Sequence, residues 1–296
     1  MALRPPPTER TTADNRRFGV INLDKPPGPS SHQVSSWVRD LLGVDRAAHA
    51  GTLDPKVTGC LPVLVGDATR LAPAFLVGEK EYVAVLELHD QPPADLEAVI
   101  AEFVGPIYQK PPRKSAVARR LRVREIHELA VLSVEGRKVL LRIRCESGTY
   151  VRKLCHDLGL ALGVGAHMGD LRRTATVPFD DTDLVSAHDL LDAVAEAEAG
   201  DEEPLEAVLQ PAERALDHLP RVVLAESAAR EVANGAPVYA PGVLEVDGID
   251  SDAVDPDAEP LVACFTPDGS AVCLGSLVGD PNAHQGLVVD LERVLV

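Results

Sequence analysis

The chain has 296 residues, of which 45% are hydrophobic, which is enough to bury the core of one large domain and a second, smaller one. No apolar run approaches the roughly 18 residues of a membrane-spanning helix, and the polar, proline-rich first 17 residues lack the features of a signal or transit peptide, so a cytoplasmic location is expected. The net charge of −17, taken over the whole chain, argues against a polyanionic partner.

The charge is distributed unevenly along the chain. Residues 104–173 contain 15 Lys or Arg and 6 Asp or Glu, whereas the rest of the chain contains 14 and 40. A basic middle section in an acidic protein predicts a binding surface for a polyanion. Only seven of the 29 basic residues are Lys, and this acid-rich, lysine-poor composition predicts a halophilic protein, because high salt screens charge repulsion.

The expected elements begin after residues 1–17, which are interpreted as a flexible N-terminal arm. Residues 18–23 alternate like a strand, and Ser30 or Ser31 is expected to cap a helix that ends at Gly43. The pattern up to residue 103 then predicts a loop around Asp54, a strand at 61–65, a short helix at 68–76, a strand at 81–89 and a helix at 95–103.

The basic section predicts two alternating strands joined by a hairpin turn at Glu135-Gly136. The elements expected next are a helix from Thr149, its candidate cap, to Leu162, a strand near 171–177 and two helices at 184–198 and 205–218. From Leu219 on, a short helix and short β-like runs predict a small, mostly β domain. The chain is therefore divided into a main domain at residues 18–218 and a second domain at 219–296.

A single carboxylate, Asp54, lies in the stretch GTLDPKVTG, just before an apolar strand. Gly51 and Gly59 permit backbone conformations that other residues avoid, and Pro55 stiffens the turn. The residues alone are equally compatible with a catalytic carboxylate held on a rigid turn and with an Asx-type turn that caps its own loop.

Three further candidates, His49, Tyr82 and Arg152, lie beside or between regular elements, where functional residues concentrate. The glycines between residues 159 and 169 do not form a dinucleotide-binding fingerprint. The five cysteines are odd in number and form no C-x-x-C pair, so neither a disulfide framework nor a metal site is expected. The predicted chemistry is redox-neutral, needs no cofactor and uses side chains alone.

Five motifs follow one another along the main domain: LDKPPGPSSHQV, GTLDPKVTGCLPVLVGDATRL, EKEY, SGTYVR and GAHMGDLRR. With the tail segment LPRVVLAESAAREVANGAPVYAPGV, they resemble the TruB/dyskerin family of RNA pseudouridine synthases, in which a PUA RNA-binding domain follows the catalytic domain. DPKVTGCLPV and YQKPPRKSAVARRLRVREIHEL resemble the archaeal and eukaryotic branch of that family. The resemblance implies an α/β (α+β) fold with a mixed, mostly antiparallel central sheet in a catalytic domain at 18–218, and a β-barrel-like PUA domain at 219–296.

The resemblance implies roles for the three catalytic candidates. Asp54 matches the family's catalytic aspartate, which acts either as a nucleophile on the ribose or as the base that removes a sugar proton. Arg152 matches the arginine that pairs with it, and a neighbouring guanidinium favours the ionised carboxylate. Tyr82 matches the active-site tyrosine, which stacks on the base and helps to remove the C5 proton.

Three more residues are implied on the substrate side. His49 matches a histidine that helps to displace the target nucleotide from its stack, and Tyr150 is expected to pack behind the site. Leu171 matches an apolar residue of the uracil pocket, although simple core packing explains it almost as well. Lys25 and Pro26 belong to a motif that is expected to support the loop rather than to take part in chemistry.

The resemblance also implies RNA partners. The side chains expected to hold RNA phosphates are Lys110, Arg113, Arg119, Arg120, Arg172 and Arg173. The expected function is that of an archaeal-type catalytic subunit of the H/ACA guide ribonucleoprotein, which works with guide RNA and small accessory proteins on rRNA and also on the tRNA T-loop. Two alternatives stay open, a stand-alone tRNA T-loop enzyme and a non-catalytic RNA-binding scaffold.

Overall fold

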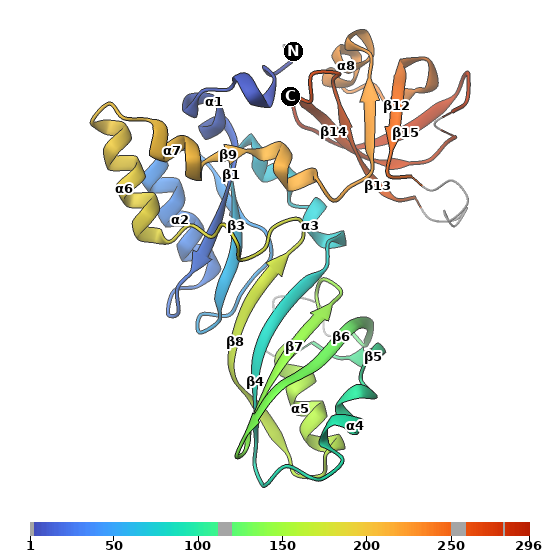
Figure 1. Cartoon of the computed structure of the whole chain (residues 1–296). Helices are drawn as coiled ribbons and strands as arrows, with labels where there is room; N and C mark the ends of the chain where they lie inside the picture. Colours follow the sequence, from blue (N-terminus) through green and yellow to red (C-terminus); the bar gives the residue numbers. More distant parts are fainter. Residues whose placement is uncertain (1–2, 112–119, 250–258, 281) are drawn as a thin grey trace.

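Two β-sheets organise the part of the chain that the computed structural model describes, which is residues 3–111, 120–249, 259–280 and 282–296 (Figure 1). The larger sheet has the strand order β5-β6-β7-β4-β8-β3-β1-β9, with β2 paired to β3. Its strands are β1 (Phe18–Lys25), β2 (Ala47–His49), β3 (Thr58–Gly66), β4 (Lys80–Leu88), β5 (Gly105–Gln109), β6 (Arg122–Glu135), β7 (Lys138–Cys145), β8 (Ala166–Thr176) and β9 (Gln210–Pro211). Strands β3 and β8 run parallel, and the other described neighbours run antiparallel. The expected mixed, mostly antiparallel central sheet is confirmed.

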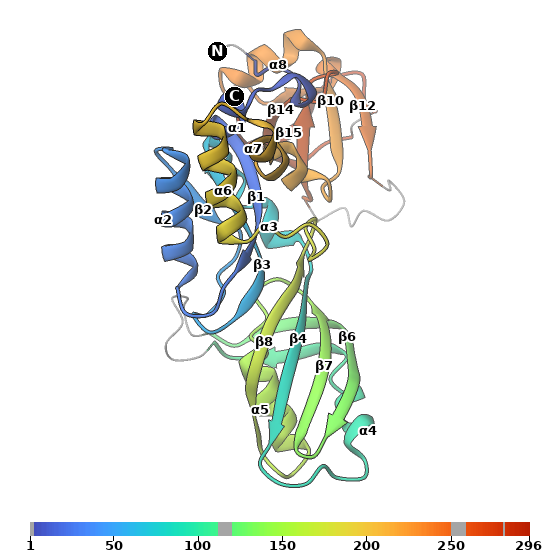
Figure 2. The same ribbon diagram turned by 60° about the vertical axis from the view of Figure 1, so that its left-hand side comes forward.

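Helices pack against this sheet in two places. Helix α5 packs on β8, and α4 lies against β6 and α5 in the lower part of Figure 1. Helices α2 and α6 lie side by side near β1, β2 and β3, as Figure 2 shows. The helices are α1 (Thr12–Arg17), α2 (Ser31–Leu42), α3 (Ala74–Val77), α4 (Leu96–Ala101), α5 (Val151–Ala161), α6 (Ala187–Glu198), α7 (Glu203–Val208) and α8 (Glu226–Ala233), with 3-10 turns η1 (Pro7–Glu9), η2 (Asp67–Leu71), η3 (Ala212–Leu216) and η4 (Ala240–Gly242). Among the described residues, none of these helices is long and apolar enough to cross a membrane.

Helix α2 follows directly from its local sequence. The Ser30 hydroxyl accepts a hydrogen bond from the Gln33 amide, and the Gln33 side chain accepts one from the Ser30 amide, so the two residues form a capping box. Gly43 ends the helix in the left-handed conformation, with φ +63°. The helix buries Val34 and Val38 on its inner face and begins beside the Asp54 turn.

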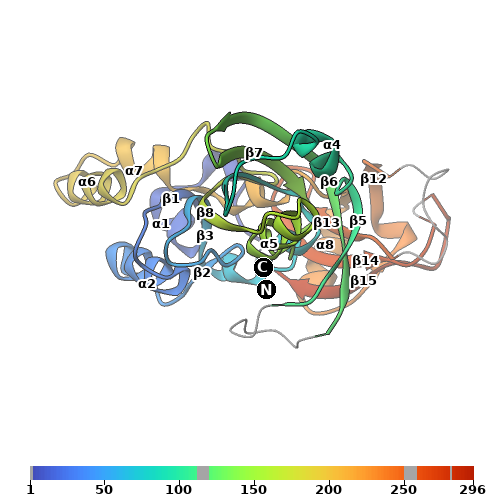
Figure 3. The same ribbon diagram turned by 90° about the horizontal axis from the view of Figure 1, so that it is seen from below.

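The second sheet has the order β11-β15-β14-β13-β10-β12 and forms the curled C-terminal domain at the upper right of Figure 1. Its strands are β10 (Arg221–Leu224), β11 (Val238–Tyr239), β12 (Val243–Asp247), β13 (Leu261–Phe265), β14 (Ala271–Leu277) and β15 (Leu287–Val294). This sheet and helices α6 and α7 lie on opposite sides of the molecule (Figures 1 and 3). The expected curled, barrel-like C-terminal domain is confirmed.

A shared hydrophobic cluster joins the two domains. Phe18 of β1, Leu216 of η3 and Phe265 of β13 belong to the same buried cluster. Because both sheets contribute to this cluster, the domains are packed together rather than only linked by a tether.

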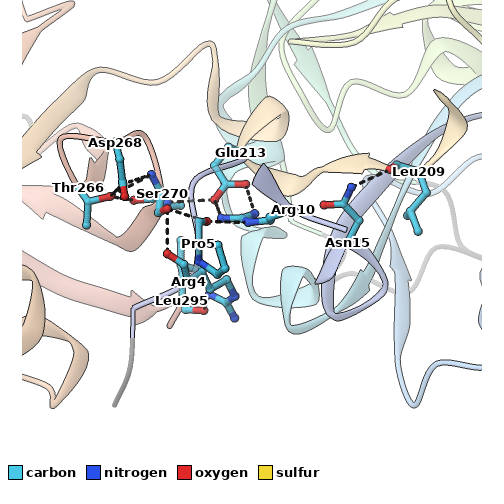
Figure 4. Close-up of polar contacts among 11 residues, drawn as sticks. Arg4, Pro5, Arg10, Asn15, Leu209, Glu213, Thr266, Asp268, Ser270 and Leu295 are labelled. Atoms are coloured by element: carbon cyan, nitrogen blue, oxygen red, sulfur yellow. Dashed lines mark hydrogen bonds and ion pairs between the residues drawn. The ribbon is translucent and has the colours of Figure 1, made fainter. Parts of the chain in front are cut away.

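The N-terminal segment differs from the flexible arm that the sequence predicts. Its helix α1 has its own capping box, formed by Thr11 and Asp14. The Arg10 guanidinium, fully buried, donates two hydrogen bonds of 2.7 Å to Glu213, which also accepts the Ala271 amide at 3.0 Å. The Ser270 hydroxyl, in the C-terminal domain, donates to main-chain carbonyls of the segment (Figure 4). The N-terminal segment therefore contacts both domains. Because these partners are distant in the sequence, the composition of the segment does not show that it is ordered.

Two helix predictions are also wrong in detail. Thr149 does not cap α5, because its hydroxyl donates to the Glu146 carbonyl at 2.8 Å in the preceding turn, and Tyr150 occupies the cap position. The helix expected at 205–218 is divided into α7, β9 and η3. Pro211 has no amide hydrogen for a helix interior and holds an extended conformation beside β1 instead.

Candidate active site

Asp54 lies in the turn between β2 and β3 and faces Arg152 in the first turn of α5. The Arg152 guanidinium forms an ion pair with the Asp54 carboxylate, and both side chains are about half exposed, at 52% and 51%. Among the described residues, the carboxylate caps no amide of its own loop; the turn closes through a main-chain bond from the Val57 amide to the Asp54 carbonyl at 3.0 Å. The geometry thus leaves an ion-paired, solvent-accessible carboxylate on a closed turn.

Buried groups hold the backbone of this turn. The Lys25 ammonium, with no exposed surface, donates to the carbonyls of Pro26 at 2.9 Å, Pro55 at 3.0 Å and Val57 at 2.8 Å. The Ser31 hydroxyl exchanges two hydrogen bonds with the Leu53 main chain, at 2.8 and 3.0 Å. Lys25 therefore supports the loop, as its motif predicts, and Ser31 is a second anchor that sequence reasoning identified only as a helix-cap candidate.

The two glycines of the turn have the conformations that their identity predicts. Gly51 and Gly59 have φ of +94° and +99°. A Cβ atom on Gly59 would lie 2.2 Å from the Arg173 carbonyl, because β3 and β8 meet in parallel at this point. Gly59 is thus required both for its dihedral angle and for close strand contact.

Tyr82 lies in β4, between β7 and β8, and is 8% exposed. Burial raises the pKa of its phenol, while the positive charge of the Arg173 guanidinium acts in the opposite direction. Tyr82 is therefore a neutral phenol near pH 7, and its partner on β8, Arg173, donates to the Gly51 carbonyl of the Asp54 turn.

His49 ends β2, just before the turn. Burial, followed by the charges of His32 and Arg173, lowers the pKa of His49 to about 4. The His32 ring lies 5.0 Å from the His49 ring at 74°, and the buried Nδ1 atom of His49 has no hydrogen-bond partner among the described residues. The imidazole is neutral at neutral pH, and its Nδ1 atom can still bind a donor.

Tyr150 and Leu171, the other residues expected on the substrate side, have different contacts. Tyr150 is the N-cap residue of α5, and its main chain exchanges hydrogen bonds of 2.9 and 3.2 Å with the side-chain amide of Gln109. Gln109, 1% exposed, thus orients the helix that carries Arg152, and the sequence carries no signal for this role. Leu171 is partly buried against the main core beside Ala84, so core packing is present at this position.

The residues expected to bind RNA phosphates have different environments. Lys110 and Arg120 are exposed, and Arg113 and Arg119 lie outside the described residues. Arg172 is partly exposed and holds Asp24 with two hydrogen bonds, of 2.9 and 3.0 Å. Arg173 is only 2% exposed, so the prediction that it contacts RNA phosphates is wrong. Within the residues that the structure describes, no group of three or more His, Cys, Asp or Glu is arranged to hold a metal ion.

Family models match most of the chain. The "TruB family pseudouridylate synthase (N terminal domain)" model matches residues 39–95 and 90–151, and the "tRNA pseudouridylate synthase B C-terminal domain" model matches 152–217. The "DKCLD (NUC011) domain" model matches residues 5–35, and the "PUA domain" model matches 220–283.

Named relatives cover the whole chain. A "Probable tRNA pseudouridine synthase B" of Halobacterium salinarum is 66% identical over 100% of both chains, and one of Haloarcula marismortui is 64% identical over 100% of this chain and 94% of the relative. These source organisms agree with the expected adaptation to salt.

Solved structures share the complete fold. The "Crystal Structure of a Cbf5-Nop10-Gar1 Complex" contains a chain that is 44% identical, with a TM-score of 0.92, over 99% of this chain and 90% of that one. The "Structure of H/ACA RNP bound to a substrate RNA containing 2'-deoxyuridine" gives 42% identity and a TM-score of 0.89, over 99% and 90%.

Proposed function

Because the chain belongs to the TruB family of pseudouridylate synthases, we propose that it isomerises uridine to pseudouridine in RNA with Asp54 as the reacting carboxylate. The observation that carries this proposal is the ion pair of Asp54 and Arg152 at the surface of a turn with a clamped backbone. A carboxylate that must meet one ribose atom has to be charged, accessible and fixed in place. The ion pair with Arg152, the half-exposed side chain and the clamped backbone of the turn support this role for Asp54.

The reaction is an isomerisation, so its atoms balance without a redox partner. The N1–C1′ bond breaks, the base turns over, a C5–C1′ bond forms, the C5 proton leaves and N1 takes up a proton. Asp54 starts this sequence either by attacking the ribose or by removing a sugar proton, and both routes need the ionised form. Arg152 stabilises that form, and its half-exposed side chain is accessible to a nucleotide.

Tyr82 and His49 act as neutral groups in this proposal. The neutral Tyr82 phenol faces the base and serves in removal of the C5 proton. The neutral His49 imidazole, beside the turn, contacts the target after it leaves its stack. Leu171 and Tyr150 complete the proposed substrate pocket.

The proposed setting is an H/ACA guide ribonucleoprotein in the cytoplasm, with rRNA as its substrate. Two observations support it, the likeness over 99% of this chain to the chains of the Cbf5-Nop10-Gar1 and substrate-bound H/ACA structures, and the PUA match at 220–283. Guide RNA and small accessory proteins are the proposed partners, and Lys110, Arg120 and Arg172 are proposed phosphate contacts. Arg113 and Arg119 stay predictions from the sequence.

The test is Asp54→Asn, which keeps the size of the side chain and removes its charge. Particles assembled with guide RNA are expected to lose pseudouridine formation in a matched rRNA substrate, while the variant still co-purifies with its partners. Asp45→Asn is the matched control, because Asp45 is an exposed carboxylate in the preceding loop, and it should retain full activity. Undiminished conversion by Asp54→Asn would refute the catalytic assignment and leave the scaffold function as the better explanation.

A second function, modification of the tRNA T-loop without a guide, is favoured by one observation. The relatives at 64–66% identity are named "Probable tRNA pseudouridine synthase B". The purified chain, given unmodified tRNA and no guide RNA, should convert a T-loop uridine if it has this activity. Conversion that needs added guide RNA would restrict the enzyme to the guided reaction.

A further inference from the structure

Arg173 of β8 is a buried cation beside the proposed site, and its donors point to backbone atoms. The residue is 2% exposed. Its Nε donates to the Cys60 carbonyl at 2.7 Å, and its Nη2 donates to the Gly51 carbonyl at 3.2 Å. Gly51 begins the stretch that carries Asp54, and Cys60 follows its end. One guanidinium therefore ties together both ends of the turn.

The same guanidinium reaches the proposed base-facing residue. Tyr82 and Arg173 are paired across β4 and β8, so their side chains lie on the same face of the sheet, and the positive charge of Arg173 acts on the Tyr82 phenol. The turn that carries Asp54 and the strand that carries Tyr82 thus both lie against the same buried guanidinium, although they are separate in the sequence. A planar guanidinium, with donors in fixed directions, suits this task better than a flexible ammonium.

Arg173 has no ion pair with a carboxylate among the described residues. Burying a charge without an opposite charge is unfavourable, and an apolar side chain of similar volume would fill the space without that penalty. Its charge also affects its surroundings: burial lowers the pKa of Lys80 to about 7, and Arg173 contributes to that decrease. Packing alone therefore does not account for an arginine at this position.

We infer that Arg173 is a positioning residue of the isomerisation, which holds the Asp54 turn in a fixed arrangement against Tyr82 on the neighbouring strand. This inference rests on the proposed function. It replaces the phosphate contact that the sequence predicts for Arg173. Loss of the guanidinium should therefore slow the chemical step and leave the affinity for RNA unchanged.

The experiment compares Arg173→Lys and Arg173→Met with the exposed control Arg39→Lys, in particles with guide RNA and substrate. Single-turnover rates at saturating RNA are expected to fall roughly 100-fold for both Arg173 variants, the size of effect that misplacement by about 1 Å produces. The substrate dissociation constant should stay within about twofold of wild type. Arg39→Lys, exposed on α2, should match wild type in both measurements. A lower affinity at an unchanged saturating rate, or no change at all, would overturn the inference.

Hydrogen exchange separates positioning from general stability. In Arg173→Lys, amides of residues 51–60 are expected to exchange faster, while those of α5 and the second sheet keep wild-type rates. Loss of folding, or faster exchange throughout the chain, would assign Arg173 to overall stability and overturn the inference. A failure of the proposed function gives a different result. In that case Asp54→Asn would retain activity, whatever the result for the Arg173 variants.

Discussion

The ion pair of Arg10 and Glu213 should be one of the strongest single stabilising contacts between the N-terminal segment and the rest of the chain. Its side chains are 0% and 10% exposed, and two hydrogen bonds of 2.7 Å join them. Glu213→Gln leaves the Arg10 charge buried without an opposite charge, which costs about 3–5 kcal/mol. The Ala271 amide also loses its charged acceptor. We therefore expect the free energy of unfolding to fall by this amount.

Urea unfolding followed by circular dichroism measures the change. Glu226→Gln is the matched control, because the Arg230–Glu226 pair is 66% and 68% exposed and its loss should cost about 0.5 kcal/mol or less. Added salt should not reproduce the effect, since solvent ions do not reach the buried pair. The double variant Arg10→Met with Glu213→Leu should recover most of the stability, because it removes both charges. A loss below about 1 kcal/mol for Glu213→Gln would refute this reasoning.

Two further predictions concern the site itself. Gly59→Ala should destabilise the protein and slow isomerisation more than Gly163→Ala does. Both glycines have positive φ, a conformation that costs an alanine about 1–2 kcal/mol. Only the Cβ added at Gly59 would also clash with a carbonyl, at 2.2 Å. Equal unfolding free energies would contradict the steric argument. The folded pKa of His49, about 4, lies below its ordinary 6.5, so the stability from its neutral form is present above pH 6.5 and declines as the pH falls toward 4. Urea unfolding at several pH values should show a smaller decline in His49→Asn, and identical pH dependence would exclude His49 as its source.

Much of the fold was predictable because its signals are local. The Ser30 cap and Gly43 define α2 through bonds between residues close in the sequence. Gly136, with φ +58°, forms the hairpin between β6 and β7 at the expected place. The turn that carries Asp54 could also be identified, since glycine and proline restrict the backbone wherever they occur.

The main elements, the turn around Asp54 and, through the motifs, the family could thus be read from the amino-acid sequence. Which charges are buried, and which groups they bind, follows from the folded arrangement of distant segments. Arg172 and Arg173 are neighbours with the same side chain, yet one pairs with Asp24 at the surface and the other is enclosed beneath the turn. Likewise, the N-terminal segment is ordered by Glu213 and Ser270. Burial depends on segments that come together only when the chain folds, and no local pattern contains that information.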